Sequence, residues 1–178
     1  MAYITFHDTN KQIVKGNEVK EFLSTQDVIY EKWGVDRLDK KLKENYTLSD
    51  EEKQQIIEAF RAEIDDLSTR RGYQTEDIVV LSEATPNLEA LLDKFKEEHH
   101  HTDDEVRFCV DGHGIFTLKG NDGRYFDVVM EPGDLISVPA YTRHWFTLCE
   151  DRKIKCIRIF VTPAGWEAIY EETETAAN

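Results

Sequence analysis

The chain has 178 residues and a mass of 20.7 kDa, which is the size of about one domain. A chain of this mass can bury roughly 70% of the surface that it exposes when extended, which is enough for a hydrophobic core without disulfides or a structural metal. Its 36 acidic and 22 basic residues give a formal charge of −14, which argues against a nucleic-acid partner because phosphate would be repelled. Neither a long apolar run nor a basic start followed by an apolar stretch is present, so we expect no membrane partner, no secretory signal and a cytoplasmic location.

Helical patterns and charge dominate the first hundred residues or so. Residues 2–7 and 28–35 are expected to form short strands. A capping box at Ser49-Asp50-Glu51-Glu52 begins a helix that we expect to end near Gly72. The helix is predicted from apolar residues at helical spacing, namely Ile56, Ile57, Phe60, Ile64 and Leu67.

A strand and a second helix are predicted next. The run Asp77–Leu81 indicates a buried strand. Pro86 then opens a helix whose end carries the basic residues Lys94 and Lys96. The apolar residues of this helix are Leu88, Leu91, Leu92 and Phe95.

From Glu105 onward the hydrophobic period changes to two, and turn residues separate short β-branched and aromatic runs. We expect strands at 105–110, 114–119, 124–130, 134–138, 144–149 and 154–161. Strands this short, with turns about every ten residues, are typical of an antiparallel sandwich or barrel. A closing helical turn is expected from Gly165 to Tyr170, followed by a disordered tail at 171–178.

Three consecutive histidines precede the first of these strands. If the chain is extended here, His99, His101, Glu105 and Arg107 share parity and their side chains point to one face. His100 has the opposite parity and is left out. The two histidines and the carboxylate are therefore candidate metal ligands, with the arginine beside them.

A second segment supplies a third histidine. Gly133 and Asp134 form a turn before a buried strand, a turn containing Pro139 follows, and His144 opens the next strand. In an antiparallel barrel His144 can face back toward the first cluster. Three imidazoles and one carboxylate suit iron, nickel, manganese or cobalt, whereas structural zinc sites are more often rich in thiolates.

The pattern His99-x-His101-x-x-x-Glu105 followed by Gly133-Asp134…Pro139…His144 resembles the two cupin motifs. Together with Glu105-Val106-Arg107-Phe108, His144-Trp145-Phe146 and Ile157-Arg158-Ile159-Phe160, it resembles the acireductone dioxygenase family of methionine salvage. The resemblance implies a mainly β fold, a cupin barrel or jelly roll with helices from the amino-terminal half. The expected organisation is a single domain over 1–178, in which 1–98 pack on a metal-binding core at 99–161.

The resemblance also implies an activity. The family oxidises an acireductone with dioxygen, using one metal ion that His99, His101, Glu105 and His144 would bind here. Iron directs cleavage to formate and 4-methylthio-2-oxobutanoate, and nickel directs it to formate, carbon monoxide and 3-methylthiopropanoate. No residue in the sequence decides between the two metals.

The implied substrate binds as a dianion, so positive charge is expected inside an otherwise apolar barrel. Arg107 shares the ligand face and Arg158 lies in an apolar strand, which makes both candidate catalytic residues. Pairing with an acidic residue is the structural alternative for each arginine. Phe95 and Phe146 are candidate walls of the substrate pocket, and packing in the core explains an aromatic residue equally well.

Two other functions stay open on the sequence, namely a different cupin enzyme of the sugar-isomerase type and a metal-binding cupin without turnover. The protein is expected to be a monomer. His7 and His113 are expected to be surface or packing residues, and Gly112-x-Gly114 lacks the strand-to-helix context of a dinucleotide site. The three cysteines at 109, 149 and 156 lie in apolar runs, where buried inert thiols are common.

Overall fold

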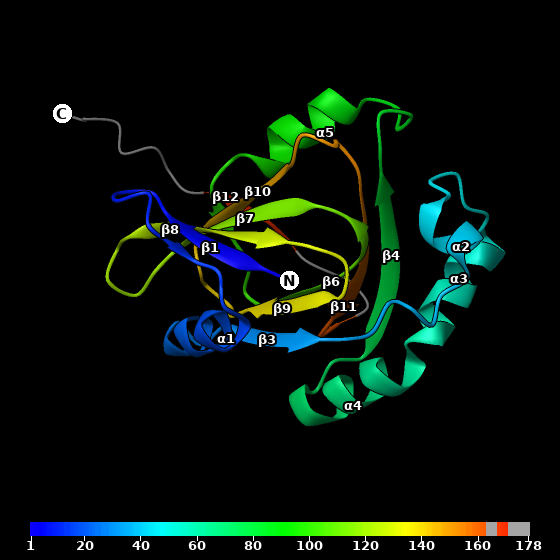
Figure 1. Ribbon diagram of the computed structural model, residues 1–178, viewed down its shortest axis with the longest axis horizontal. Helices are drawn as coiled ribbons and strands as arrows, with labels where there is room; N and C mark the ends of the chain where they lie inside the picture. Colours follow the sequence, from blue (N-terminus) through cyan, green and yellow to red (C-terminus); the bar gives the residue numbers. More distant parts are fainter. Residues whose placement is uncertain (163–166, 171–178) are drawn as a thin grey trace.

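The structure is a computed structural model that describes residues 1–162 and 167–170. Within these ranges the strands form two antiparallel sheets that face each other across the middle of the molecule (Figure 1). The larger sheet contains, in spatial order, β12 (Ile169–Tyr170), β5 (His99–His100), β10 (His144–Leu148), β7 (Gly114–Lys119), β8 (Tyr125–Met130), β1 (Tyr3–Phe6) and β2 (Gln12–Ile13). The smaller sheet contains β3 (Ile29–Lys32), β9 (Asp134–Val138), β6 (Glu105–Gly112), β11 (Ile154–Phe160) and β4 (Thr75–Leu81). The predicted mainly β architecture is confirmed.

The helices lie outside the sheets (Figure 1). α5 (Leu88–Phe95) contacts β10, and α1 (Gly16–Thr25) contacts β3. The remaining helices, α2 (Lys40–Glu44), α3 (Asp50–Ala59) and α4 (Arg61–Arg71), lie along the side of the molecule that carries β4. The amino-terminal half thus supplies the helices, and it also supplies strands to both sheets.

The smaller sheet is buried on both faces. In β6 the odd-numbered Cys109 packs in the core between the two sheets, whereas Val106, Phe108 and Val110 pack in a second core beneath α3 and α4. Both faces of this strand are removed from water, although the charged residues Glu105 and Arg107 alternate with the apolar residues Val106 and Phe108 along it. Glu105, Arg107 and Cys109 of β6 face the interior of the barrel, where the candidate site lies.

The predicted helix from Ser49 to Gly72 is two helices. The capping box of Ser49 and Glu52 is present, and Gly72 closes the second helix in the left-handed conformation at φ 79°. Between the helices Phe60 leaves helical geometry, with φ −109° and ψ 15°, and buries its ring against Trp33 and Phe108. The break lets both helices follow the curved face of the smaller sheet.

A buried lysine fastens the end of α2 to the smaller sheet. Lys155 in β11 has no exposed surface, and its ammonium donates to the carbonyl oxygens of Leu42, Lys43 and Asn45 at 2.7–2.8 Å. Burial lowers the pKa of Lys155 to about 8, so the ammonium stays mostly charged at neutral pH. The charge binds the carbonyl end of the short helix, where the helix dipole favours a cation.

Two further predicted elements differ from the structure. β4 is half-buried along most of its length because it is the edge strand of its sheet. The helical turn predicted over Gly165–Tyr170 is wrong where it is described, since Ile169 and Tyr170 pair with β5 as a strand. Residues 163–166 and the tail at 171–178 lie outside the described residues.

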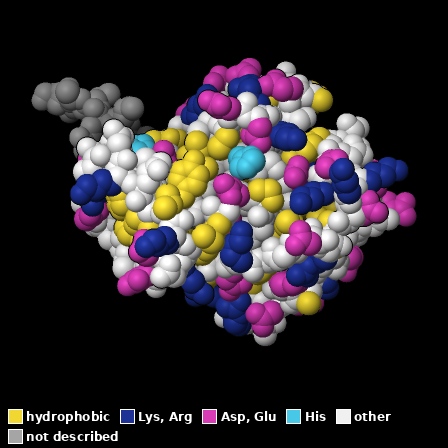
Figure 2. All heavy atoms as spheres, in the orientation of Figure 1, with side chains coloured by type: hydrophobic (Ala, Val, Ile, Leu, Met, Phe, Trp, Pro, Cys, Tyr) yellow, Lys and Arg dark blue, Asp and Glu magenta, His cyan; other side chains and the backbone are white. Residues whose placement is uncertain are grey.

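Acidic and basic side chains are interspersed over the face of the molecule shown in Figure 2. Many of them are paired, as Arg61 is with Glu58, Asp65 and Glu76. None of the described helices has the length and apolar character needed to cross a membrane.

Candidate metal centre

Four side chains meet at one end of the barrel interior. His99, His101, Glu105 and His144 are buried, and one ligand atom from each lies within 4.8 Å of all the others. Glu105 Oε2 is 3.0 Å from His101 Nε2 and 2.5 Å from His144 Nε2. The structure therefore brings together all four predicted ligands.

The chain reaches this arrangement by a different path from the one predicted. His99 lies in β5 of the larger sheet, where its Cα pairs with that of His144, whereas Glu105 begins β6 of the smaller sheet. The chain crosses from one sheet to the other between them, and Tyr141 N donates to His101 O at 2.8 Å beside the crossing. The expectation of one extended strand was wrong, although the residues it selected do converge. His100 lies outside the cluster, as expected.

Each histidine is oriented by its other ring nitrogen. Nδ1 of His99, His101 and His144 lies 2.7–2.8 Å from the backbone carbonyl of Glu97, Glu167 and Thr142, respectively. A carbonyl can only accept, so Nδ1 carries a proton in all three rings, and Nε2 is the ring atom that faces the common centre. Hydrogen bonds of this kind are typical of metal-ligating histidines.

The protonation states also suit a metal. Burial by itself would raise the pKa of the Glu105 carboxyl, but the charges of His144 and Arg107, with hydrogen bonds from His101 and His144, hold it well below its usual range. Burial lowers the pKa of His99. Burial acts in the same direction on His144, but the charge of Glu105 and the hydrogen bond to it raise the pKa of His144, so a cation that binds there would displace a proton. An ionised carboxylate and a neutral imidazole are the forms that bind a cation. Three nitrogens and one oxygen fit iron, nickel, manganese or cobalt.

The ligands line a cavity of about 170 Å³, which also contains the four predicted substrate-site residues Arg107, Arg158, Phe95 and Phe146. Arg107 is buried, and its Nε donates to Glu105 Oε1 at 2.8 Å. Arg158 is the Cα partner of Arg107 on β11 and is paired with Asp77, donating from Nε at 2.8 Å and from Nη2 at 2.5 Å. Both arginines therefore have the acidic partner that the structural alternative requires. The partner of Arg107 is Glu105, which is itself a candidate metal ligand.

The two phenylalanines both line the cavity and contact each other edge to face, with ring centroids 6.2 Å apart. Phe146 is buried and packs on Gly114, where a Cβ atom would come within 2.5 Å of the ring. Gly114 therefore leaves the space that the Phe146 ring occupies in the cavity wall. This steric role accounts for the glycine without a nucleotide-binding site. The aromatic pair gives this wall its apolar character.

The sequence did not indicate Lys94, Ala168 and Tyr170 as site residues, although they also line the cavity. Lys94 Nζ lies 5.2 Å from the centroid of the Tyr170 ring, which in turn lies 5.8 Å from the ring of His99. Lys94 was interpreted only as a charge at a helix end, and Tyr170 as part of a helical turn. No spacing rule links residue 170 to residue 99, because β12 meets β5 only through sheet pairing.

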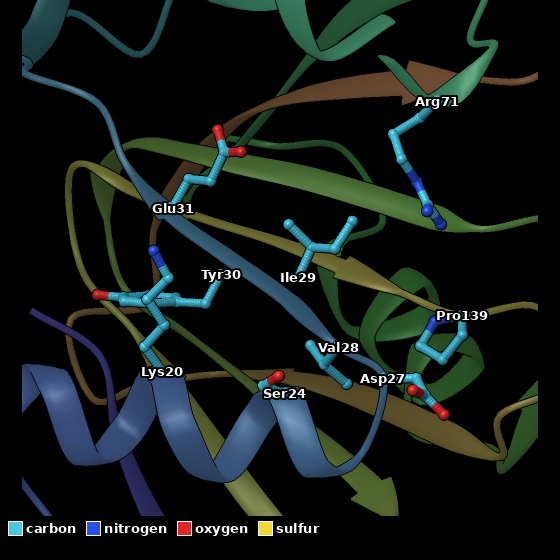
Figure 3. A pocket seen from close by; sticks show the side chains of 9 residues that line it. All are labelled: Lys20, Ser24, Asp27, Val28, Ile29, Tyr30, Glu31, Arg71 and Pro139. Atoms are coloured by element: carbon cyan, nitrogen blue, oxygen red, sulfur yellow. The ribbon is translucent and has the colours of Figure 1, made fainter.

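A larger hollow of about 440 Å³ lies elsewhere, between α1, β3 and Pro139 (Figure 3). Lys20 and Arg71 lie on opposite sides of it, and Val28 and Ile29 lie between them. The described side chains that line it include neither an imidazole nor a thiol. Size alone therefore does not identify the reactive site.

The remaining sequence candidates lie away from the metal cluster. His7 pairs with Asp127, and His113 pairs with Asp151, each at 2.7 Å on the surface. Among the cysteines only the residues at 109 and 156 are buried, and the third is partly exposed.

Comparisons with known proteins agree with this site. The model of the ARD/ARD′ family matches residues 2–168. Acireductone dioxygenases of Bacillus licheniformis and Bacillus subtilis are 58% and 57% identical over 173 residues, which cover 97% of this chain and 97% of each relative. A solved acireductone dioxygenase from Bacillus anthracis, with a cadmium ion in its active centre, matches with a TM-score of 0.93 at 54% identity, covering 96% of this chain and 98% of that one. The fold, the four-residue site and these matches show that the chain belongs to the acireductone dioxygenase family of enzymes.

Proposed function

We propose that this chain cleaves the acireductone 1,2-dihydroxy-3-keto-5-methylthiopentene with dioxygen, as a step of methionine salvage. The observation that carries the proposal is the convergence of His99, His101, Glu105 and His144 at a cavity that Arg107 also lines. One Fe(II) or Ni(II) ion, held by these four residues, would bind the substrate through its oxygens and bring it together with dioxygen. Membership of the family supports the same substrate class.

The chain's own residues would bind and orient the anionic substrate. Arg107 places a positive charge on the cavity wall beside Glu105, where it stabilises negative charge on the substrate. Arg158 adds a second guanidinium, which is partly neutralised by Asp77. Phe95 and Phe146 offer an apolar surface for the methylthio tail, which has no hydrogen-bonding group to satisfy.

The bound metal would select the products. Iron gives formate and 4-methylthio-2-oxobutanoate, and nickel gives formate, carbon monoxide and 3-methylthiopropanoate. In both cases one molecule of dioxygen is consumed and both of its atoms enter the products. We further propose that the enzyme is cytoplasmic and acts as a monomer, without nucleic-acid or membrane partners.

Product analysis tests this function. The protein is stripped of metal, reloaded with Fe(II) or Ni(II) under anaerobic conditions, mixed with acireductone and then exposed to oxygen. We expect one oxygen consumed per substrate in each case, with carbon monoxide only from the nickel form. Substrate loss without oxygen uptake would instead support isomerase chemistry, and tight metal binding with no substrate loss would support a binding protein.

A further inference from the structure

Two buried cysteines lie directly opposite each other on neighbouring strands of the smaller sheet. Cys109 in β6 and Cys156 in β11 are Cα partners in the antiparallel register, beside a register shift between Lys155 and Cys156. Both side chains belong to the core between the two sheets, with exposures of 0% and 1%. The two thiols therefore face the same interior space and not opposite faces of the sheet.

The spacing of such a pair matches that of a disulfide. Directly opposed residues in antiparallel strands have Cα atoms about 4.5–5.5 Å apart, and disulfides join Cα atoms about 4.4–6.8 Å apart. The bond can therefore form without separating or sliding the strands. The third cysteine, Cys149, follows β10 in the other sheet.

The surroundings make the two sulfurs unequal. The hydrogen bond with Cys109, together with the positive charges of Arg107 and Arg158, lowers the pKa of Cys156 although burial opposes this shift. The same contact with Cys156, together with burial, raises the pKa of the Cys109 thiol. One sulfur is thus favoured as the attacking thiolate and the other as the thiol that resolves the product.

Arg107 and Arg158 place this pair close to the cavity. They are register partners on the same two strands, they line the cavity wall, and their side chains share an interior face with the cysteines. The cysteine pair is the next inward-facing pair along these strands. The cavity that a small oxidant can enter is thus lined by the inward-facing pair next to the cysteines.

We propose that Cys109 and Cys156 form a dithiol site that hydrogen peroxide converts reversibly into a disulfide. The Cys156 sulfur attacks one peroxide oxygen, so that an S–O bond forms, the O–O bond breaks, and hydroxide leaves and is protonated to water. The Cys109 sulfur then attacks the sulfenic sulfur, so that the S–S bond forms and the hydroxyl leaves with the Cys109 proton as a second water. Two thiols lose two electrons and two protons, and one peroxide becomes two waters.

Intact mass spectrometry after thiol alkylation tests this site independently of the acireductone activity. Reduced, nickel-loaded protein, which avoids oxidation catalysed by iron, is treated with hydrogen peroxide, quenched, denatured and alkylated with N-ethylmaleimide. We expect the alkylated thiols to fall from three to one per chain. Peptide mapping should join Cys109 to Cys156, and dithiothreitol should restore both thiols.

Matched variants assign the bond. Cys149→Ser should still form it, whereas Cys109→Ala and Cys156→Ala should each lose it. If either alanine variant does not fold, peptide mapping of the wild-type chain decides the question alone. Three free thiols under conditions that fully oxidise a reference dithiol would overturn the proposal. So would a bond to Cys149, or oxygen addition to Cys109 or Cys156 without a cross-link.

Discussion

Replacing Arg107 with methionine removes a positive charge that contacts the carboxylate of the metal site. Arg107 Nε donates to Glu105 Oε1, while His101 and His144 face Oε2. An anionic substrate oxygen at a separation of about 5 Å from the guanidinium would be attracted by about 3 kcal/mol at an effective dielectric constant of about 20. Arg107→Met should therefore lower kcat/KM per bound metal by about two decades.

The same substitution has a separable effect on the metal. Arg107 holds Oε1 and leaves Oε2 directed at the histidines, so its loss frees the carboxylate to rotate. Loss of a partner that orients a ligand costs about 10–100-fold in metal affinity. Metal titration of the apoprotein measures this effect, and anaerobically started kinetics at saturating metal measure the effect on the substrate.

Arg158→Met is the matched control. Arg158 pairs in register with Arg107 and lines the same cavity, but its guanidinium binds Asp77, whereas that of Arg107 binds the candidate ligand Glu105. We expect a loss of kcat/KM of less than about tenfold and no change in metal affinity. Normal kcat/KM per bound metal in Arg107→Met would refute the electrostatic role of Arg107. Normal metal affinity would refute its role in orienting Glu105.

Three further results are expected. His144→Ala removes a candidate ligand and should lower metal affinity by more than about 100-fold, the upper end of the loss expected when only an orienting partner is removed. His100→Ala, the control outside the cluster, should keep its metal on elemental analysis, and equal metal content in the two variants would contradict the ligand assignment. Lys155→Met should lower Tm by about 10 °C, because three carbonyls lose their donor at a cost of about 3–5 kcal/mol. Lys153 is a neighbouring lysine that is not fully buried, so in thermal melts the control variant Lys153→Met should unfold at a much higher temperature than Lys155→Met. Burial and nearby acidic groups raise the pKa of Cys149 to about 11. Its alkylation at pH 8 should therefore be about 200-fold slower than that of an ordinary thiol, and the rate should increase as the pH rises toward 11. An alkylation rate that levels off near pH 9 would contradict this.

Local patterns in the sequence determined the strands of the carboxyl-terminal half and the four candidate metal ligands. Alternating side chains between Gly and Pro turns predicted β6 to β11 within about two residues at each end, because period and turn chemistry depend on near neighbours. The resemblance to a known family rested on the same short motifs. Both predictions hold because each depends on residues that are close in sequence.

The tertiary structure alone decided which distant residues meet. It set His99 and Glu105 on different sheets, broke the predicted long helix at Phe60, and paired Arg158 with Asp77 across two strands. A strand pattern is compatible with many registers and neighbours, because its period specifies faces but not partners. Packing of the two sheets and the outer helices selects one register, and that register places Arg107 on Glu105 and Tyr170 beside His99.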